Sequence, residues 1–109
     1  MTHQNPSRVF APYVYFECKN YGKDIDNPSL EQLTGRFSQF RGNLGFLVCR
    51  TVKDEITLLK RCKGVLNDNR GAVLILTDQD LITMLNNIKN GCRLNNEKIL
   101  THKYKRLIG

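Results

Sequence analysis

The sequence contains no tryptophan, and aromatic residues make up only 8% of its 109 residues. This scarcity disfavours a platform on which the bases of a single-stranded nucleic acid could stack. No apolar run reaches about 18 residues, so no membrane span is expected. The first ten residues, MTHQNPSRVF, lack the apolar core of a secretory signal peptide. We therefore expect a cytoplasmic protein.

Several motifs that would define a function are also missing. The four cysteines form no C-x-x-C pair and the two histidines lie near opposite ends of the chain, which disfavours a structural zinc site and favours reduced thiols. There is no Gly-rich phosphate loop, no nucleophile–base spacing and no helix-turn-helix or zinc-finger signature. Sequence-specific recognition of DNA bases is therefore not expected.

Positive charge is abundant, with a formal net charge of +7. Such an excess favours binding to polyanions, and the alternative is simply a basic surface. Two groups of basic residues could follow a DNA backbone or could be solvated faces. They are Lys53, Lys60, Arg61 and Lys63, and then Lys98, Lys103, Lys105 and Arg106.

Apolar runs alternate with segments of helical period, which predicts a single α/β domain over 1–109. Strands separated by helices imply β-α-β crossovers and a short, mainly parallel, three-layer sheet. The basic tail, 93–109, could be a helix, a strand or an arm. Predicted strands cover 9–18, 44–50 and 71–78, and predicted helices cover 27–42, 53–69 and 79–90.

The helical spacing also predicts which side chains are buried. The predicted inner positions are Leu30, Leu33, Phe37 and Phe40, then Ile56, Leu59, Cys62 and Leu66, then Leu81, Leu85 and Ile88. Asp78 or Asp80 is expected to cap the third helix, with a ligand site after the strand as the alternative.

Two opposite charges lie within the first strand, in YVYFECKNYG. Because side chains alternate along a strand, Glu17 and Lys19 are expected on one face, about 7 Å apart. A carboxylate, with a neighbouring carbonyl such as that of Cys18, suits Mg²⁺, and an ammonium can stabilise charge on a phosphate. The alternative is a solvated ion pair on an exposed strand.

The segments YFECKNYG, EQLTGRFSQFRGNLGFLVCR and GAVLILTDQDL together resemble the PD-(D/E)XK nuclease superfamily. The resemblance runs from about Val9 to Leu85 and is closest to the catalytic domains of type IV (Mrr-like) restriction endonucleases. It implies a restriction-endonuclease-like fold that hydrolyses phosphodiester bonds of DNA with Mg²⁺, for which Mn²⁺ can substitute.

The resemblance also implies roles for particular residues. Glu17 and the Cys18 carbonyl would bind the metal, Lys19 would be the catalytic lysine, and Gln32 would face the active centre. Lys23, Arg36 and Arg41 would contact DNA, with Arg36 four residues after Gln32 on the same helix face. A capping-box role for Gln32 and a surface role for Arg36 are the alternatives.

One feature departs from the family pattern. The usual acidic residue before the E-x-K strand has no counterpart, because 1–15 contain no Asp or Glu. Asp24 and Asp26 are possible substitutes, although their segment is typical of a polar loop. We therefore expect an incomplete core, completed by a missing N-terminal segment, a partner chain or a homodimer. The alternative function is a non-catalytic relative that binds DNA or dimerises.

Overall fold

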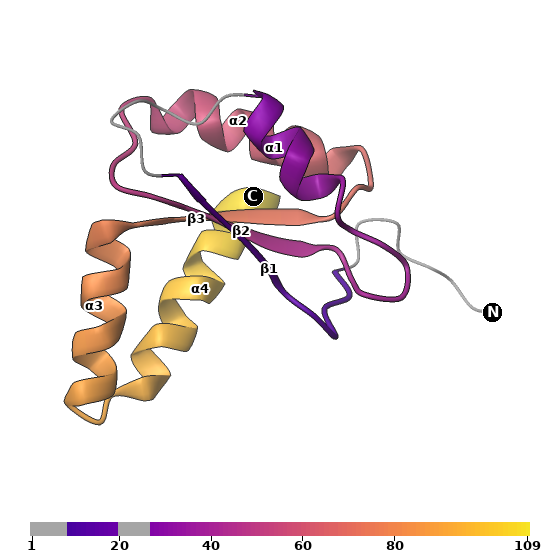
Figure 1. Ribbon diagram of the computed structural model, residues 1–109. Helices are drawn as coiled ribbons and strands as arrows, with labels where there is room; N and C mark the ends of the chain where they lie inside the picture. Colours follow the sequence, from indigo (N-terminus) through magenta and orange to yellow (C-terminus); the bar gives the residue numbers. More distant parts are fainter. Residues whose placement is uncertain (1–8, 20–26) are drawn as a thin grey trace.

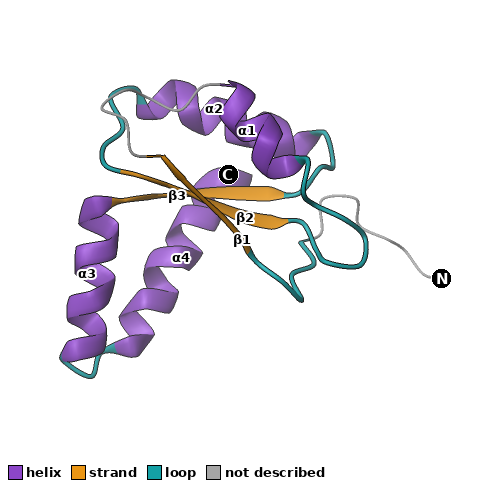
Figure 2. Cartoon of the chain, viewed as in Figure 1, coloured by secondary structure: helices purple, strands orange, loops and turns teal. Residues whose placement is uncertain are grey.

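A computed structural model describes residues 9–19 and 27–109, and the predicted α/β class is confirmed. Three parallel strands form one sheet in the order β1-β2-β3 (Figure 1). The strands are β1 (Tyr15–Lys19), β2 (Leu44–Cys49) and β3 (Ala72–Thr77). The four helices are α1 (Asn27–Thr34), α2 (Glu55–Asn67), α3 (Asp78–Lys89) and α4 (Arg93–Ile108) (Figure 2).

The helices cover the two faces of the sheet in separate layers. Because both crossovers run in the same direction across the sheet, α1 and α2 lie together on one face (Figure 1). The α3–α4 hairpin lies on the other side, and α4 returns past β3 toward α2. The basic tail is therefore a helix. No helix of the described residues is both long enough and apolar enough to cross a membrane.

The core lies between the sheet and α1 and α2. Leu33 of α1 and Leu47 of β2 are fully buried, as are Cys62 of α2 and Val73 of β3. Gly45 allows α1 to approach closely, because a Cβ there would stand 3.0 Å from the Leu33 side chain. This contact identifies the face of β2 that is turned toward α1.

The first helix ends earlier than the spacing predicts. α1 stops at Thr34, whose hydroxyl donates to the Leu30 carbonyl at 3.0 Å. The Gly35 amide still donates four residues back, to Glu31, but the amides of Arg36 and Phe37 donate to carbonyls three residues back, which tightens the chain into a turn. The prediction of a helix that continues to Gly42 is wrong: Gly42 has φ +114° and closes a loop instead.

Two predicted apolar stripes are partly wrong: in α2 the buried stripe is rotated away from Ile56, and in α3 it is shorter than predicted. Ile56 of α2 is exposed, and the buried positions of that helix are Leu58, Cys62, Val65 and Leu66. In α3, Leu81 packs on the core, but Leu85 and Ile88 are exposed. A three-stranded sheet is too narrow to cover a helix that extends beyond its edge, as α3 does in Figure 1. Phe40, in the loop after α1, is also exposed.

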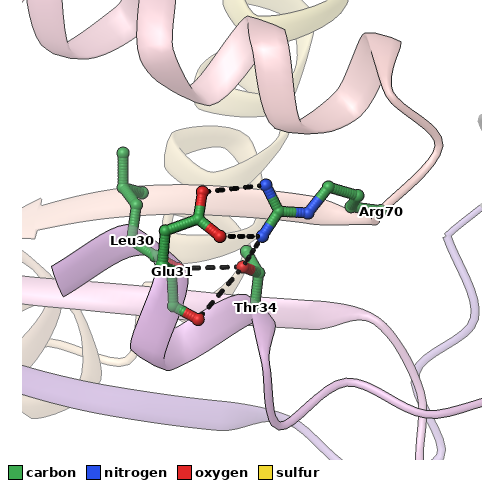
Figure 3. A network of polar contacts seen from close by, with 4 residues as sticks. All are labelled: Leu30, Glu31, Thr34 and Arg70. Carbon is green, nitrogen blue, oxygen red and sulfur yellow. Dashed lines mark hydrogen bonds and ion pairs between the residues drawn. The ribbon is translucent and has the colours of Figure 1, made fainter. Parts of the chain in front are cut away.

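An ion pair joins α1 to the turn before β3 (Figure 3). Both guanidinium nitrogens of Arg70 donate to the Glu31 carboxylate, at 3.0 and 2.7 Å, and one also donates to the Thr34 hydroxyl. The hydrogen bonds from Arg70 lower the pKa of Glu31 below its usual value. This bidentate contact fixes the amino end of β3 against the end of α1.

We predict that Arg70→Lys removes part of the acid sensitivity of the fold. Because the pKa of Glu31 is lowered on folding, the pair stabilises the protein above about pH 4.5, and this contribution is lost as pH falls through the lowered value. The pair is solvent-exposed, so the melting temperature should drop by only a few degrees at pH 7. Thermal melts of both proteins from pH 7 to pH 3 check this. The gap between them should close at low pH, and a constant gap would contradict the prediction.

Candidate functional site

Glu17 is the centre of the candidate site. It lies opposite Leu47 in the register of β1 and β2, so it shares the face of the sheet that carries Gly45 and looks toward α1. Its side chain is 17% exposed, and its Oε1 lies 3.1 Å from Nη2 of Arg36. A carboxylate and a guanidinium thus meet at the middle residue of β1, on the face turned toward α1.

The turn after α1, and not the helix itself, places Arg36 beside Glu17. Arg36 is two residues beyond the last residue of α1, and its amide donates to the Leu33 carbonyl at 3.1 Å. The next residue, Phe37, packs its ring on Tyr15 of β1 with the centroids 5.6 Å apart. The predicted position of Arg36 on the helix face of Gln32 is therefore wrong, although Arg36 does reach the E-x-K strand.

The other predicted site residues stand in different positions. Gln32 is exposed on α1, and its orientation toward Glu17 stays a prediction. The Cys18 side chain is exposed and alternates to the opposite face of β1 from Glu17, so its backbone carbonyl is the relevant ligand. Lys19 ends β1 in register with Cys49, and its side chain lies outside the described structure. Lys23, Asp24 and Asp26 also lie outside the described residues.

Arg41 belongs to the opposite end of the strand. Its carbonyl accepts a hydrogen bond from the Tyr13 amide at 3.0 Å, and its own amide donates to the Ser38 hydroxyl at 2.9 Å. Tyr13 precedes Glu17 by four residues, which correspond to about 13 Å of extended chain. The backbone of Arg41 therefore lies beside the amino end of β1, whereas the Arg36 side chain reaches Glu17 in the middle of the strand.

The described residues do not by themselves form a magnesium site. Among them, no group of three or more His, Cys, Asp or Glu side chains is arranged to hold a metal ion. Glu17 and the Cys18 carbonyl supply at most a few oxygen ligands, whereas Mg²⁺ needs a nearly octahedral shell. The Arg36 guanidinium also competes with a cation for the carboxylate. Any Mg²⁺ or Mn²⁺ at Glu17 would need ligands from elsewhere.

Comparisons with protein-family models, with curated proteins and with solved structures found no match to this chain. The resemblance to the PD-(D/E)XK nucleases stays a prediction.

A second polar cluster, at the end of β3, was only partly foreseen. Thr77 is the N-cap of α3, and its hydroxyl accepts from the Asp80 amide while the Asp80 carboxylate accepts from the Thr77 amide. Asp80 therefore closes a capping box, which the spacing T-x-x-D could have indicated. Lys103 of α4 adds an ion pair to Asp80 at 2.9 Å. The predicted capping role of this acidic pair is confirmed for Asp80, with Thr77 at the N-cap position itself.

The electrostatics of this cluster come from competing effects. Burial raises the pKa of Asp80, but the Thr77 amide and the Lys103 ammonium together lower it below its usual value. Asp80 therefore stays ionised and ties α3 to α4. The contact with Lys103 could not be read from the sequence, because the tail that carries Lys103 had no clear secondary structure.

Proposed function

We propose that this chain hydrolyses phosphodiester bonds of DNA in a metal-dependent nuclease centre built around Glu17. The observation that carries the proposal is the position of Glu17 in the middle of the parallel edge strand β1, within an E-x-K sequence and 3.1 Å from Arg36. A carboxylate beside a guanidinium, in a strand whose sequence also carries Lys19, suits a site that holds both a metal ion and a phosphate.

Each residue has a separate role in this proposal. Glu17 supplies one oxygen ligand for Mg²⁺ or Mn²⁺, and the Cys18 carbonyl supplies another. The remaining protein ligands come from outside the described residues, either from this chain or from a partner chain. When bound, the metal supplies positive charge beside the phosphate. Arg36 then leaves Glu17 to pair with a phosphate oxygen, and Lys19 stabilises the charge that develops there.

The open edge of the sheet is where a completing segment could add. Within the described residues, β1 pairs only with β2. On the face of β1 turned away from α1, the Phe16 ring stacks on Phe46 at 5.1 Å yet stays 57% exposed. An edge strand with exposed apolar side chains favours pairing with another strand. A homodimer or a partner chain at this edge is therefore part of the proposal.

A second candidate function is binding of DNA without cleavage. The observation in its favour is that Arg36 already neutralises Glu17, while the described residues hold no cluster of three metal-ligand side chains. Helix α4 is strongly basic, since it contains Arg93, Lys98, Lys103, Lys105 and Arg106 against the single acid Glu97. These cations would hold a DNA backbone through charge alone.

Cleavage of supercoiled plasmid DNA tests the two candidates against each other. The wild-type chain should nick the plasmid with Mg²⁺ or Mn²⁺ but not with EDTA. Lys19→Ala should lower the rate at least about 100-fold, as expected for a charge that acts on the transition state. Lys89→Ala, at the exposed end of α3, is the matched control and should cut normally.

An equally inert wild type and Lys19→Ala variant, both folded by circular dichroism, would reject the nuclease proposal for the isolated chain. Binding of a duplex oligonucleotide would then support the second candidate. Its affinity should fall steeply with salt, and the slope should become shallower when Lys98 and Lys105 are both replaced by Gln. An affinity that does not depend on salt would reject that candidate as well.

A further inference from the structure

A cavity lies at the carboxyl end of β3, between α2 and α4, on a different strand from Glu17. Its volume is about 150 Å³. Five of its lining residues are buried hydrophobic side chains: Leu58, Cys62, Val73, Leu74 and Leu107. Burial raises the pKa of the Cys62 thiol to about 12, so this thiol stays protonated at neutral pH and is not a nucleophile. A cavity of this size, with one apolar wall, accommodates a small ring or a chain of about six carbons.

The mouth of the cavity carries two ion pairs of different strength. Lys103 lies 2.9 Å from the Asp80 carboxylate, and that carboxylate is also held by the Thr77 amide and hydroxyl. Arg106 lies 4.0 Å from Glu55, beyond hydrogen-bonding distance, and both side chains are about half exposed or more. All four charged side chains line the same cavity. Asp80 is therefore firmly engaged, whereas Arg106 is only loosely paired.

We propose that this cavity binds a small carboxylate with an apolar tail of about six carbons. The tail lies against the apolar wall, and the carboxylate replaces Glu55 as the partner of the Arg106 guanidinium. Lys103, which has donors beyond the one directed at Asp80, adds a second hydrogen bond.

The charges at the mouth select among small ligands. Arg106 presents a planar fork of donors that matches a carboxylate. An ammonium of the same length would be repelled by Arg106 and Lys103, and only Glu55 would attract it, because Asp80 is already held by Lys103 and Thr77. A phosphate, with its higher charge, would meet stronger repulsion from Glu55 and Asp80. Since the four charges sum to zero, a single negative charge is tolerated once Glu55 is displaced.

Hexanoate is the probe, and its binding to the full chain is followed by NMR chemical shifts. Hexan-1-ol and hexylamine serve as neutral and cationic analogues of equal length. Hexanoate should produce saturable shifts around β3 and α4, and hexylamine should not. Arg106→Gln should weaken hexanoate at least about 10-fold, in line with the loss of a charge-assisted hydrogen bond. Glu55→Gln should tighten it a few-fold, because the competing carboxylate is gone.

Neither substitution should change the binding of hexan-1-ol by more than about two-fold, since the alcohol carries no charge. Leu59→Phe, which adds volume at a half-buried position of the cavity wall, should weaken hexanoate and hexan-1-ol alike. The proposal is overturned if hexanoate gives no saturable shifts at the cavity. It also fails if Arg106→Gln leaves the affinity unchanged in a variant whose spectrum remains folded. These measurements do not involve plasmid cleavage, so their outcome is independent of the test of the nuclease proposal.

Discussion

Glu17→Gln should reduce DNA cleavage at least about 100-fold. The amide keeps the size of the side chain but carries no negative charge, so it is a poor ligand for Mg²⁺ and no longer holds Arg36. The fold should change little, because the Glu17–Arg36 pair is half exposed on its arginine side and such pairs contribute at most about 1 kcal/mol. If the variant loses cleavage activity but keeps its normal stability, the loss shows that Glu17 acts in the cleavage reaction and not in folding.

Initial rates of plasmid nicking measure this effect, with urea unfolding recorded for the same preparations. Glu97→Gln is the matched control, because Glu97 is exposed on α4 and lies outside the candidate site. It should cut at the wild-type rate. If Glu17→Gln cleaves DNA at a rate close to that of wild type, Glu17 has no role in the cleavage reaction, and the prediction is wrong.

Gly71→Ala should destabilise the fold by about 3–5 kcal/mol, a large part of the 5–15 kcal/mol typical of a domain. Gly71 has φ +133°, and a Cβ there would stand 2.3 Å from the Asn43 carbonyl oxygen. That oxygen accepts the amide of Ala72 at 2.8 Å, and the Asn43 side chain accepts the amide of Phe10 at 2.8 Å. The added methyl group would thus push apart the amino ends of β2 and β3 and the segment before β1.

Two other glycines separate the causes of this effect. At Gly91, φ is +74° but no atom lies within 4 Å of a built Cβ, so Gly91→Ala should cost only about 1 kcal/mol for the backbone. At Gly64, inside α2, nothing lies within 4 Å either, and Gly64→Ala should stabilise by about 0.5–1 kcal/mol. Urea unfolding of the three variants gives the ranking. Equal stabilities for the Gly71 and Gly91 variants would contradict the crowding at Asn43.

The sheet was predictable because its strands are separated by segments with a clear helical period. The end of α1 was not, because the apolar positions Phe37 and Phe40 continue the spacing of Leu30 and Leu33 past Thr34. In the structure, a tight turn after Thr34 places Phe37 in a loop, and its ring packs on Tyr15 from there. The burial of α3 was also overestimated, because sequence spacing identifies an apolar stripe but not the width of the sheet beneath it.

For the candidate site, the sequence indicated both Glu17 and Arg36, but it gave the wrong reason for their proximity. Strand alternation predicted that Glu17 and Lys19 share one face of β1, and only the register with β2 shows that the face of Glu17 is turned toward α1. The approach of Arg36 depends on the turn after α1, which no helical period encodes. The cavity beside β3 was not predicted, because it requires the packing of α4 against α2.

The location of a bound metal ion tests the central claim most directly. Mn²⁺ broadens NMR signals of nearby nuclei even when it binds weakly, so a titration of the labelled chain would show where the ion is held. The account predicts that the first signals to disappear are those of 16–19 and of Arg36, and that Glu17→Gln abolishes this selectivity. Broadening centred instead on Asp78 and Asp80, or on Asp54 and Glu55, with no early loss at Glu17, would contradict a metal-binding role for the E-x-K strand.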